Sequence, residues 1–276
     1  MFVWLASYPK SGNTLIRSML AAYFFSKDGV YDFDLIKNIK QFPKSALFER
    51  MGIDLKNEKE VVKNYIRVQE TFNKKNSLQF LKTHSYLFNI ENNPFTNLEN
   101  SLGVIYIIRD PRNVLISASH HNQKSNEETI KDMTDGYVIN KNDGTTLPVY
   151  TGNWSSNYKS WKSFKSVNKY LLVKYEDLIS DPEKCFTSVL KFTYKISNSS
   201  LKIDKNKLDN VLKTTTFEYL QNLEKKGNFK EATSVTKKID FFKYGPKNDG
   251  KKGIPKKIIE NLEKNLNKEM KELGYL

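Results

Sequence analysis

The sequence predicts an α/β fold: a single domain over residues 1–276, in which helices flank a central parallel sheet. Four short runs of branched or aromatic residues have the composition of buried parallel strands, and each is followed by polar residues that lead toward a helix. These runs are residues 2–6, 78–81, 103–108 and 169–173. A chain of 276 residues is also long enough to bury a sizeable core.

Composition narrows the class of protein further. No apolar run approaches the roughly 20 residues that a membrane span needs, so we expect no such span. The sequence begins directly with strand residues, without the charged and apolar regions of a signal peptide, which predicts a cytoplasmic location. Cys185 is the only cysteine, which excludes an internal disulfide and a cysteine-based zinc site.

The chain is basic, with 45 Lys and Arg residues against 31 Asp and Glu residues and a net charge of +14. This charge favours anionic partners, and basic residues are densest after residue 224. A nucleic-acid-binding protein is therefore one alternative. It predicts aromatic residues interleaved with the basic cluster, yet residues 224–257 contain only four, which argues against nucleic acid as the partner.

The most informative segment, YPKSGNTLIR, starts at residue 8, between the first predicted strand and a helix predicted over residues 14–25. Gly12 lets the backbone approach an anion closely, and Lys10 supplies a movable cation, so the segment predicts a phosphate or sulfate site. It is not a Walker A loop, because Asn13 rather than lysine follows Gly12. A tight turn with a solvated lysine is the alternative. The candidate ligands are Pro9, Lys10, Ser11, Gly12, Asn13 and Thr14.

A second anion site is predicted where the third strand ends. Ligands of parallel sheets bind outside the carboxyl ends of the strands, and Arg109 stands at such an end. Its guanidinium can grip a phosphate bidentately, and Ser117, two turns into a helix that starts near Pro111, can add a hydroxyl. The alternative is a structural ion pair between Arg109 and Asp110.

Histidine supplies the candidate for proton transfer. His84 lies in LKTHS, just past a predicted strand and two residues after Lys82, where it can take a proton from an acceptor hydroxyl. A capping or core histidine is the alternative. His120 and His121 end a helix and are interpreted as structural. No spacing of histidines with carboxylates suggests a metal site, so no metal is expected.

Four further features complete the organisation. Residues 120–153 are polar and are interpreted as an insertion or lid, and residues 224–252 as a mobile basic loop. A final helix is predicted over residues 256–273. After the predicted lid, three aromatic residues at helical spacing share one face of a helix. We expect this face to pack in the core; the alternative is that it forms a wall of the acceptor pocket. The three residues are Trp154, Tyr158 and Trp161.

Four segments in this order, YPKSGNTLIR, LKTHS, IIRDPRNVLIS and VKYEDL, resemble the signatures of the PAPS-dependent sulfotransferases, of the cytosolic type. PAPS is 3'-phosphoadenosine 5'-phosphosulfate. The tail, FFKYGPKNDGKK to MKELGYL, is similar to the basic loop and last helix that close these domains. The resemblance implies an architecture like that of P-loop kinases, transfer of a sulfuryl group from PAPS to a hydroxyl or amine, and release of PAP (adenosine 3',5'-bisphosphate).

The resemblance also implies roles for single residues. Residues 9–14 would form the loop for the 5'-phosphosulfate, with Lys10 stabilising the leaving oxygen. Lys82 and His84 match the family's K-x-H, whose histidine is the general base. Arg109 and Ser117 match the pair that holds the 3'-phosphate. The remaining positions that match nucleotide contacts are Tyr175, Thr215, Phe217, Lys243 and Gly245.

Three departures accompany the resemblance. Leu15 stands where many members carry a tryptophan that stacks on adenine, and the closing segment GPKNDG is longer than the family's usual G-x-x-G. In KKGIPKKIIE, Pro255 and Lys256 replace the centre of a dimer motif of animal members, so a homodimer by that route is not supported. The expected acceptor is a small molecule or glycan with a hydroxyl group. A P-loop-type kinase or NTPase is the alternative enzyme.

Overall fold

The computed structural model describes residues 1–73, 77–140, 144–226 and 240–276. Its main sheet has five strands in the order β2-β3-β1-β6-β9, and every pair of neighbours is parallel, as predicted. The strands are β1 (Phe2–Ser7), β2 (Lys40–Gln41), β3 (Gln79–Thr83), β6 (Ser101–Ile108) and β9 (Tyr170–Lys174). The sequence did not predict β2, because a two-residue edge strand with exposed polar side chains carries no apolar pattern.

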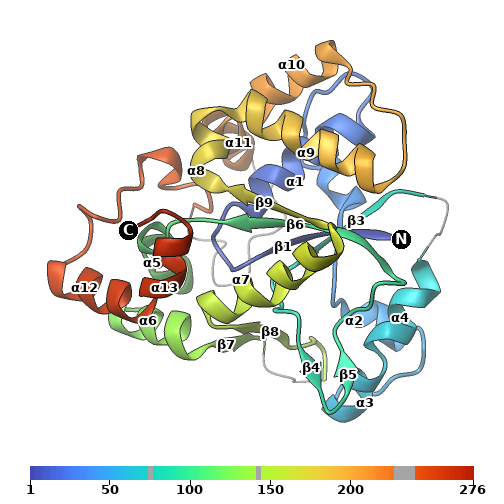
Figure 1. Ribbon diagram of the computed structural model, residues 1–276, viewed down its shortest axis with the longest axis horizontal. Helices are drawn as coiled ribbons and strands as arrows, with labels where there is room; N and C mark the ends of the chain where they lie inside the picture. Colours follow the sequence, from blue (N-terminus) through green and yellow to red (C-terminus); the bar gives the residue numbers. More distant parts are fainter. Residues whose placement is uncertain (74–76, 141–143, 227–239) are drawn as a thin grey trace.

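Helices cover both faces of this sheet (Figure 1). One face carries α1 (Asn13–Phe25), α8 (Tyr175–Ser180), α9 (Pro182–Ile196), α10 (Lys205–Thr214) and α11 (Phe217–Lys225). The other carries α2 (Ser45–Glu49), α3 (Glu58–Lys63), α4 (Tyr65–Phe72), α5 (Pro111–Asn122), α6 (Asn126–Asp135), α7 (Trp154–Lys162), α12 (Lys256–Asn265) and α13 (Asn267–Glu272). The described ranges also contain the 3₁₀ turns η1 (Leu35–Asn38), η2 (Ser163–Val167) and η4 (Gly245–Lys247).

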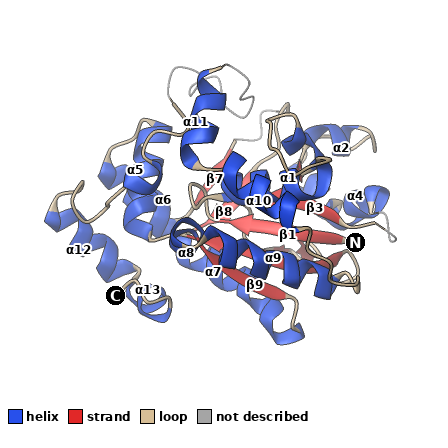
Figure 2. Ribbon diagram, turned by 90° about the horizontal axis from the view of Figure 1, so that it is seen from above, coloured by secondary structure: helices blue, strands red, loops and turns tan. Residues whose placement is uncertain are grey.

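The two faces of the sheet separate the core into two clusters, because side chains alternate along each strand. On β1, Trp4 and Ala6 point to one face, and Val3 and Leu5 point to the other; all four are fully buried. Figure 2 shows α9 and α10 lying across the face to which Val3 points. Burial on both faces explains why the central strands read as continuous apolar runs in the sequence.

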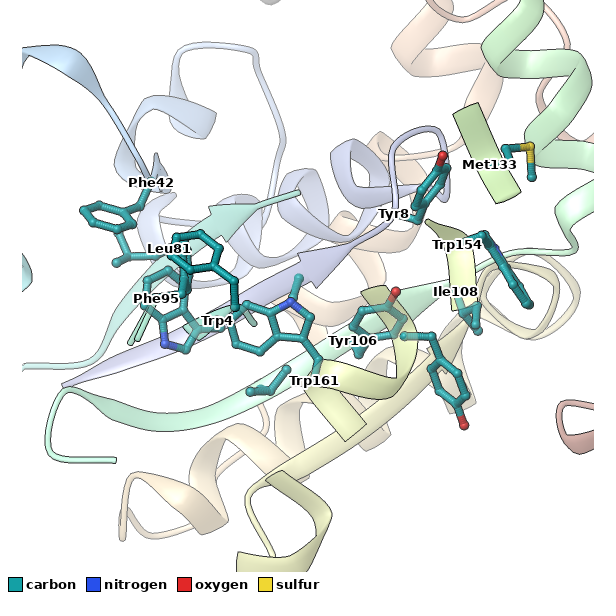
Figure 3. Packing of buried hydrophobic residues seen from close by; sticks show 14 of the residues in the cluster. Trp4, Tyr8, Phe42, Leu81, Phe95, Tyr106, Ile108, Met133, Trp154 and Trp161 are labelled. Atoms are coloured by element: carbon teal, nitrogen blue, oxygen red, sulfur yellow. The ribbon is translucent and has the colours of Figure 1, made fainter. Parts of the chain in front are cut away.

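Large aromatic side chains fill the core on the α7 face (Figure 3). The ring centroids of Trp4 and Trp161 are 5.8 Å apart, and those of Trp4 and Phe95 are 5.3 Å apart. Trp154, Tyr158 and Trp161 are all within 2% of complete burial. The prediction that the aromatic face of α7 packs in the core is therefore confirmed.

The region predicted as a polar insertion contains regular structure. Besides α6, it forms the antiparallel pair β7 (Tyr137–Ile139) and β8 (Val149–Gly152), while residues 141–143 lie outside the described part. A second small pair, β4 (Asn89–Ile90) and β5 (Asn93–Pro94), lies near α3 and α4 (Figure 1). The sequence analysis did not predict α6, because the buried face of this helix is narrow: of its residues, only Thr129, Ile130 and Met133 are buried.

The prediction of a single C-terminal helix over residues 256–273 was wrong in one respect. The helix breaks at Leu266, so that α12 and α13 follow one another and Gly274 ends the second one with a positive φ of 70°. The break allows Leu262 of α12 and Met270 of α13 both to reach full burial. None of the helices in the described ranges is long and apolar enough to cross a membrane.

Candidate active site

Four segments that are distant in the sequence meet at the carboxyl ends of the strands. Arg109, at the end of β6, donates one hydrogen bond to the backbone oxygen of Lys10 and another to that of Gly245, each 3.3 Å long. The Arg109 guanidinium also lies over the ring of Tyr175, 4.2 Å from its centroid. A Cβ atom at Gly12 would overlap the same ring, so the first loop, β6, β9 and the closing segment form one compact site.

The loop between β1 and α1 has the backbone of an anion site. Gly12 caps α1 with a φ of 99°, and Lys10 also has a left-handed φ of 65°, a conformation that costs a residue with a side chain about 1–2 kcal/mol. Ser11 is fully buried, and within the described part of the chain its hydroxyl lacks a hydrogen-bond partner. Such an orphaned donor beside the free amides of a helix N-terminus fits an anion.

Asn13 differs from its expected role. We predicted that its side chain adds a donor toward the anion. Instead, its amide nitrogen donates inward, to the backbone oxygen of Leu5 at 3.0 Å and to the hydroxyl of Ser7 at 3.1 Å. Asn13 therefore braces the loop against β1, since both of its N–H groups are used in the interior.

Lys10 lies in a poorly solvated position near a second cation, Arg109. Its Nζ lies 3.9 Å from the ring centroid of Phe241, a cation–π contact. Burial lowers the pKa of Lys10 to about 7. The nearby Arg109 guanidinium is a second cause of this decrease, and the negative charge of Glu224 partly opposes it. The ammonium is thus only partly protonated at neutral pH, and an anion that binds beside it stabilises the charged form.

We expect anion binding here to take up protons. The pKa of Lys10 is about 7 before binding, and a bound phosphate group raises it, so at pH 8 each bound anion should cause the uptake of about one proton. The affinity for a phosphate anion should accordingly fall as the pH rises above about 7. Calorimetric titration in buffers of different ionisation enthalpy measures the uptake. Lys10→Arg keeps the charge without titrating and should abolish the uptake; uptake retained by this variant would contradict the assignment.

His84 is oriented by β1. Its Nδ1 lies 2.9 Å from the backbone oxygen of Ser7 and 3.2 Å from the Ser7 hydroxyl. Burial, followed by the positive charge of Lys82, lowers the pKa of His84 well below its usual value and keeps the ring neutral at physiological pH. Lys82 itself donates to Gln41 at 2.9 Å. A neutral imidazole at the strand edge is in the correct state to accept a proton.

The alternative ion pair between Arg109 and Asp110 is wrong. Asp110 pairs with Arg112 instead, at 2.5 Å, and Arg112 reaches Glu263 at 2.7 Å. Arg109 thus keeps its charge for the site, and among the described residues its Nε has no hydrogen-bond partner although it is buried. Ser117 is half-buried in the second turn of α5.

The closing segment is docked on the start of α5. The side-chain oxygen of Asn113 accepts the N–H of Gly250 at 2.7 Å, and the backbone oxygen of Asn113 accepts the amide of Asn248 at 2.9 Å. The 3₁₀ turn η4 takes up the extra residues of GPKNDG, so Gly245 still reaches Arg109. Of the basic loop predicted over residues 224–252, residues 227–239 lie outside the described part.

Of the other predicted nucleotide contacts, Phe217 lies directly against Gly245. Phe217, at the start of α11, packs so closely on Gly245 that a Cβ atom there would overlap its ring. Thr215 is buried, and its hydroxyl donates to the backbone oxygen of Val211 at 2.7 Å. The exposed Lys243 extends over the ring of Tyr244, 5.4 Å from its centroid. Leu15, at the position of the family tryptophan, packs against the core on the α1 face.

Sequence reasoning missed several residues of this site. Glu224 accepts the backbone N–H groups of Phe241 and Phe242, which holds the aromatic rings over the site. His120 and His121, interpreted as structural, pack edge-on against Tyr244 and Phe241, respectively. Burial and then the charge of Lys10 lower the pKa of His121 to about 4.

Comparison with protein families decides the membership of the chain. The family model described as "Sulfotransferase domain" matches residues 2–274. The chain belongs to this family. Among curated relatives, the 3-alpha-hydroxysteroid sulfotransferase of Cavia porcellus is 22% identical over 79% of this chain and 65% of its own length. The flavonol 3-sulfotransferase of Flaveria bidentis is 25% identical over 99% of this chain and 83% of its own.

The match to the mammalian relatives is partial in length. The chain spans less than two thirds of the Cavia porcellus enzyme and 49% of sulfotransferase 2A6 of Rattus norvegicus, to which it is 28% identical. Among solved structures, a mouse sulfotransferase complexed with PAP has a TM-score of 0.63 at 16% identity, over 98% of this chain and 84% of the other. Retinol dehydratase in complex with retinol and PAP gives the same TM-score and identity, over 98% of this chain and 81% of the other. These likenesses confirm the fold of a sulfotransferase domain.

Proposed function

We propose that this chain transfers the sulfuryl group of PAPS to a hydroxyl or amine of a small-molecule or glycan acceptor and releases PAP. The observation that carries the proposal is the position of Arg109. It contacts the backbone of the Lys10 loop and that of Gly245 at once, while its buried Nε has no partner among the described residues. An anion loop next to a buried arginine that still has an unused N–H donor suits a nucleotide with a 5' and a separate 3' anionic group.

On the donor side, the chain stabilises the charge that develops on the leaving oxygen. Sulfuryl transfer, by analogy with phosphoryl transfer, passes through a loose transition state with charge on the leaving and peripheral oxygens. Lys10 neutralises the bridging oxygen as its bond to sulfur breaks, and the loop amides with the Ser11 hydroxyl hold the peripheral oxygens. A bound donor would also give the orphaned hydroxyl of Ser11 its missing partner.

On the acceptor side, His84 removes the proton. Its pKa is depressed by burial, so the neutral ring accepts the acceptor's proton as the new oxygen–sulfur bond forms. The relatives named for hydroxysteroids and flavonols support a hydroxyl group as the nucleophile. Residues 120–153 remain our prediction for an insertion or lid, residues 1–276 for a single domain and the cytoplasm for the location.

Calorimetric titration with PAP, beside AMP and ATP with magnesium, tests the donor site. We expect micromolar or tighter binding of PAP and much weaker binding of ATP. Binding of ATP with magnesium in preference to PAP, together with ATP hydrolysis, would instead support the kinase or NTPase alternative. Absence of PAP binding would overturn the proposal.

Arg109→Gln should weaken PAP much more than AMP, because only PAP carries the 3'-phosphate. Loss of a charge-assisted pair of about 1.5–3 kcal/mol corresponds to a roughly 10- to 150-fold weaker PAP affinity. Arg67→Gln, an identical change at an exposed position of α4, is the matched control and should leave both affinities unchanged. Equal losses for PAP and AMP in the Arg109 variant would contradict its assignment to the 3'-phosphate.

A further inference from the structure

One chain of hydrogen bonds connects the loop between β1 and α1 (residues 8–12, the anion loop) to the candidate base, His84. The amide nitrogen of Asn13, in the first turn of α1, donates to the hydroxyl of Ser7 at 3.1 Å. That hydroxyl lies 3.2 Å from Nδ1 of His84, and the backbone oxygen of Ser7 lies 2.9 Å from the same nitrogen. Ser7 is fully buried and Asn13 is 5% exposed, so water does not compete for these groups.

The direction of each hydrogen bond follows from its partners. A backbone oxygen only accepts, so the Asn13 nitrogen must be the atom that faces Leu5, at 3.0 Å, and the amide cannot be flipped. For the same reason, Nδ1 of His84 must carry a hydrogen to bond the backbone oxygen of Ser7. A neutral imidazole protonated at Nδ1 has its lone pair on Nε2, which is therefore the basic atom.

The orientation of Asn13 is maintained at a cost. Its side-chain oxygen is buried and lacks a hydrogen-bond partner within the described ranges. Burying an acceptor in this way is unfavourable, yet the amide still directs both N–H groups to β1. The Ser7 hydroxyl thereby has one lone pair fixed by Asn13 and turns the other toward His84.

We propose that Asn13 and Ser7 are positioning residues, which hold His84 as the Nδ1–H tautomer and couple its ring to the conformation of the anion loop. This inference rests on the proposed function for the role of His84 as base. The anion loop and His84 then form one unit. In the loop conformation that binds the anion, Asn13 fixes the Ser7 hydroxyl, and Ser7 in turn fixes the imidazole of His84. A nucleotide that occupies the loop is consequently sensed at the imidazole.

Ring ¹⁵N NMR tests this coupling without an acceptor, because the chain has only three histidines. His84 should show a protonated Nδ1 and an unprotonated Nε2. Ser7→Ala and Asn13→Ala should each shift the tautomer ratio by about fivefold, the effect of one lost hydrogen bond. Their double variant should add little beyond either single change, since both break the same chain. Ser18→Ala, a buried serine of α1 bonded to the Thr14 carbonyl, is the matched control.

PAP titration supplies the second measurement. PAP should shift the His84 ring signals in the unmodified protein, and in Ser7→Ala that shift should fall to less than about half although PAP affinity changes by less than about threefold. A protonated Nε2 in the unmodified protein, or ring signals unaffected by both substitutions, would overturn the inference. Failure of PAP to bind at all would refute the proposed function, while the tautomer measured without ligand still decides whether Ser7 and Asn13 hold the ring.

Discussion

Replacing Lys10 by methionine should lower sulfuryl transfer about 10²- to 10³-fold, the usual loss when one group that stabilises developing charge is removed. Methionine keeps the unbranched chain but has no charge to neutralise the leaving oxygen. PAP formation from PAPS, followed with a panel of phenol, steroid and flavonol acceptors, measures the loss. Lys63→Met, at an exposed position that ends α3, should retain full activity.

Lys10→Arg separates charge from geometry. It restores a cation that never loses its proton, so we expect part of the activity to return and the decline above pH 7 to disappear. Near-normal turnover by the methionine variant, with a folded protein and normal PAP affinity, would exclude Lys10 from the reaction. A loss that appears only in PAP affinity would assign it to binding.

Replacing His84 by asparagine should lower turnover by about 10²- to 10⁴-fold, the range of general acid–base catalysis, with little change in PAP affinity. Asparagine keeps a donor near the position of Nδ1 that can bond the Ser7 carbonyl, but it has no basic atom at the position of Nε2. The expected result is thus a loss of kcat at an almost constant affinity for the donor. Full turnover by this variant would show that another group takes the proton.

The pH dependence of kcat/KM for PAPS should report both residues. The proposed mechanism requires His84 to be neutral, and its depressed pKa puts the acid limb below pH 6.5. The same mechanism requires Lys10 to be protonated, and its pKa of about 7 in the free protein puts the alkaline limb near neutrality. His84→Asn should remove the acid limb alone and Lys10→Arg the alkaline limb alone. An alkaline limb that survives Lys10→Arg would assign it to a different group.

Much of the fold was predictable because it is encoded locally. Each central strand is buried on both faces, so its apolar run marks it regardless of what packs against it. The edge strand β2 and the helix α6 escaped prediction because they bury few side chains. The break at Leu266 also escaped, since no proline or glycine marks it in the sequence.

Local sequence patterns predicted some residues of the candidate site but not the contacts that others make. Positions after strand ends drew attention to Lys10, His84 and Arg109, since parallel strands present these residues at a common edge. Residue type alone could not tell that Asn13 turns inward or that His121 approaches Lys10. Those outcomes depend on the backbone oxygen of Leu5 and on the aromatic closing segment, neither of which is visible in the local pattern.

The sequence by itself determined the parallel sheet, the anion loop and the order of the motifs, because these follow from patterns over a few neighbouring residues. Only the tertiary structure decided how the charges are shared. Asp110 forms its ion pair with Arg112. Arg109 instead donates hydrogen bonds to the backbone oxygens of Lys10 and Gly245, which lie 99 and 136 positions away from it in the sequence. The physical reason is that burial sets these pairings and the pKa of Lys10, and burial depends on segments that meet only when the chain folds.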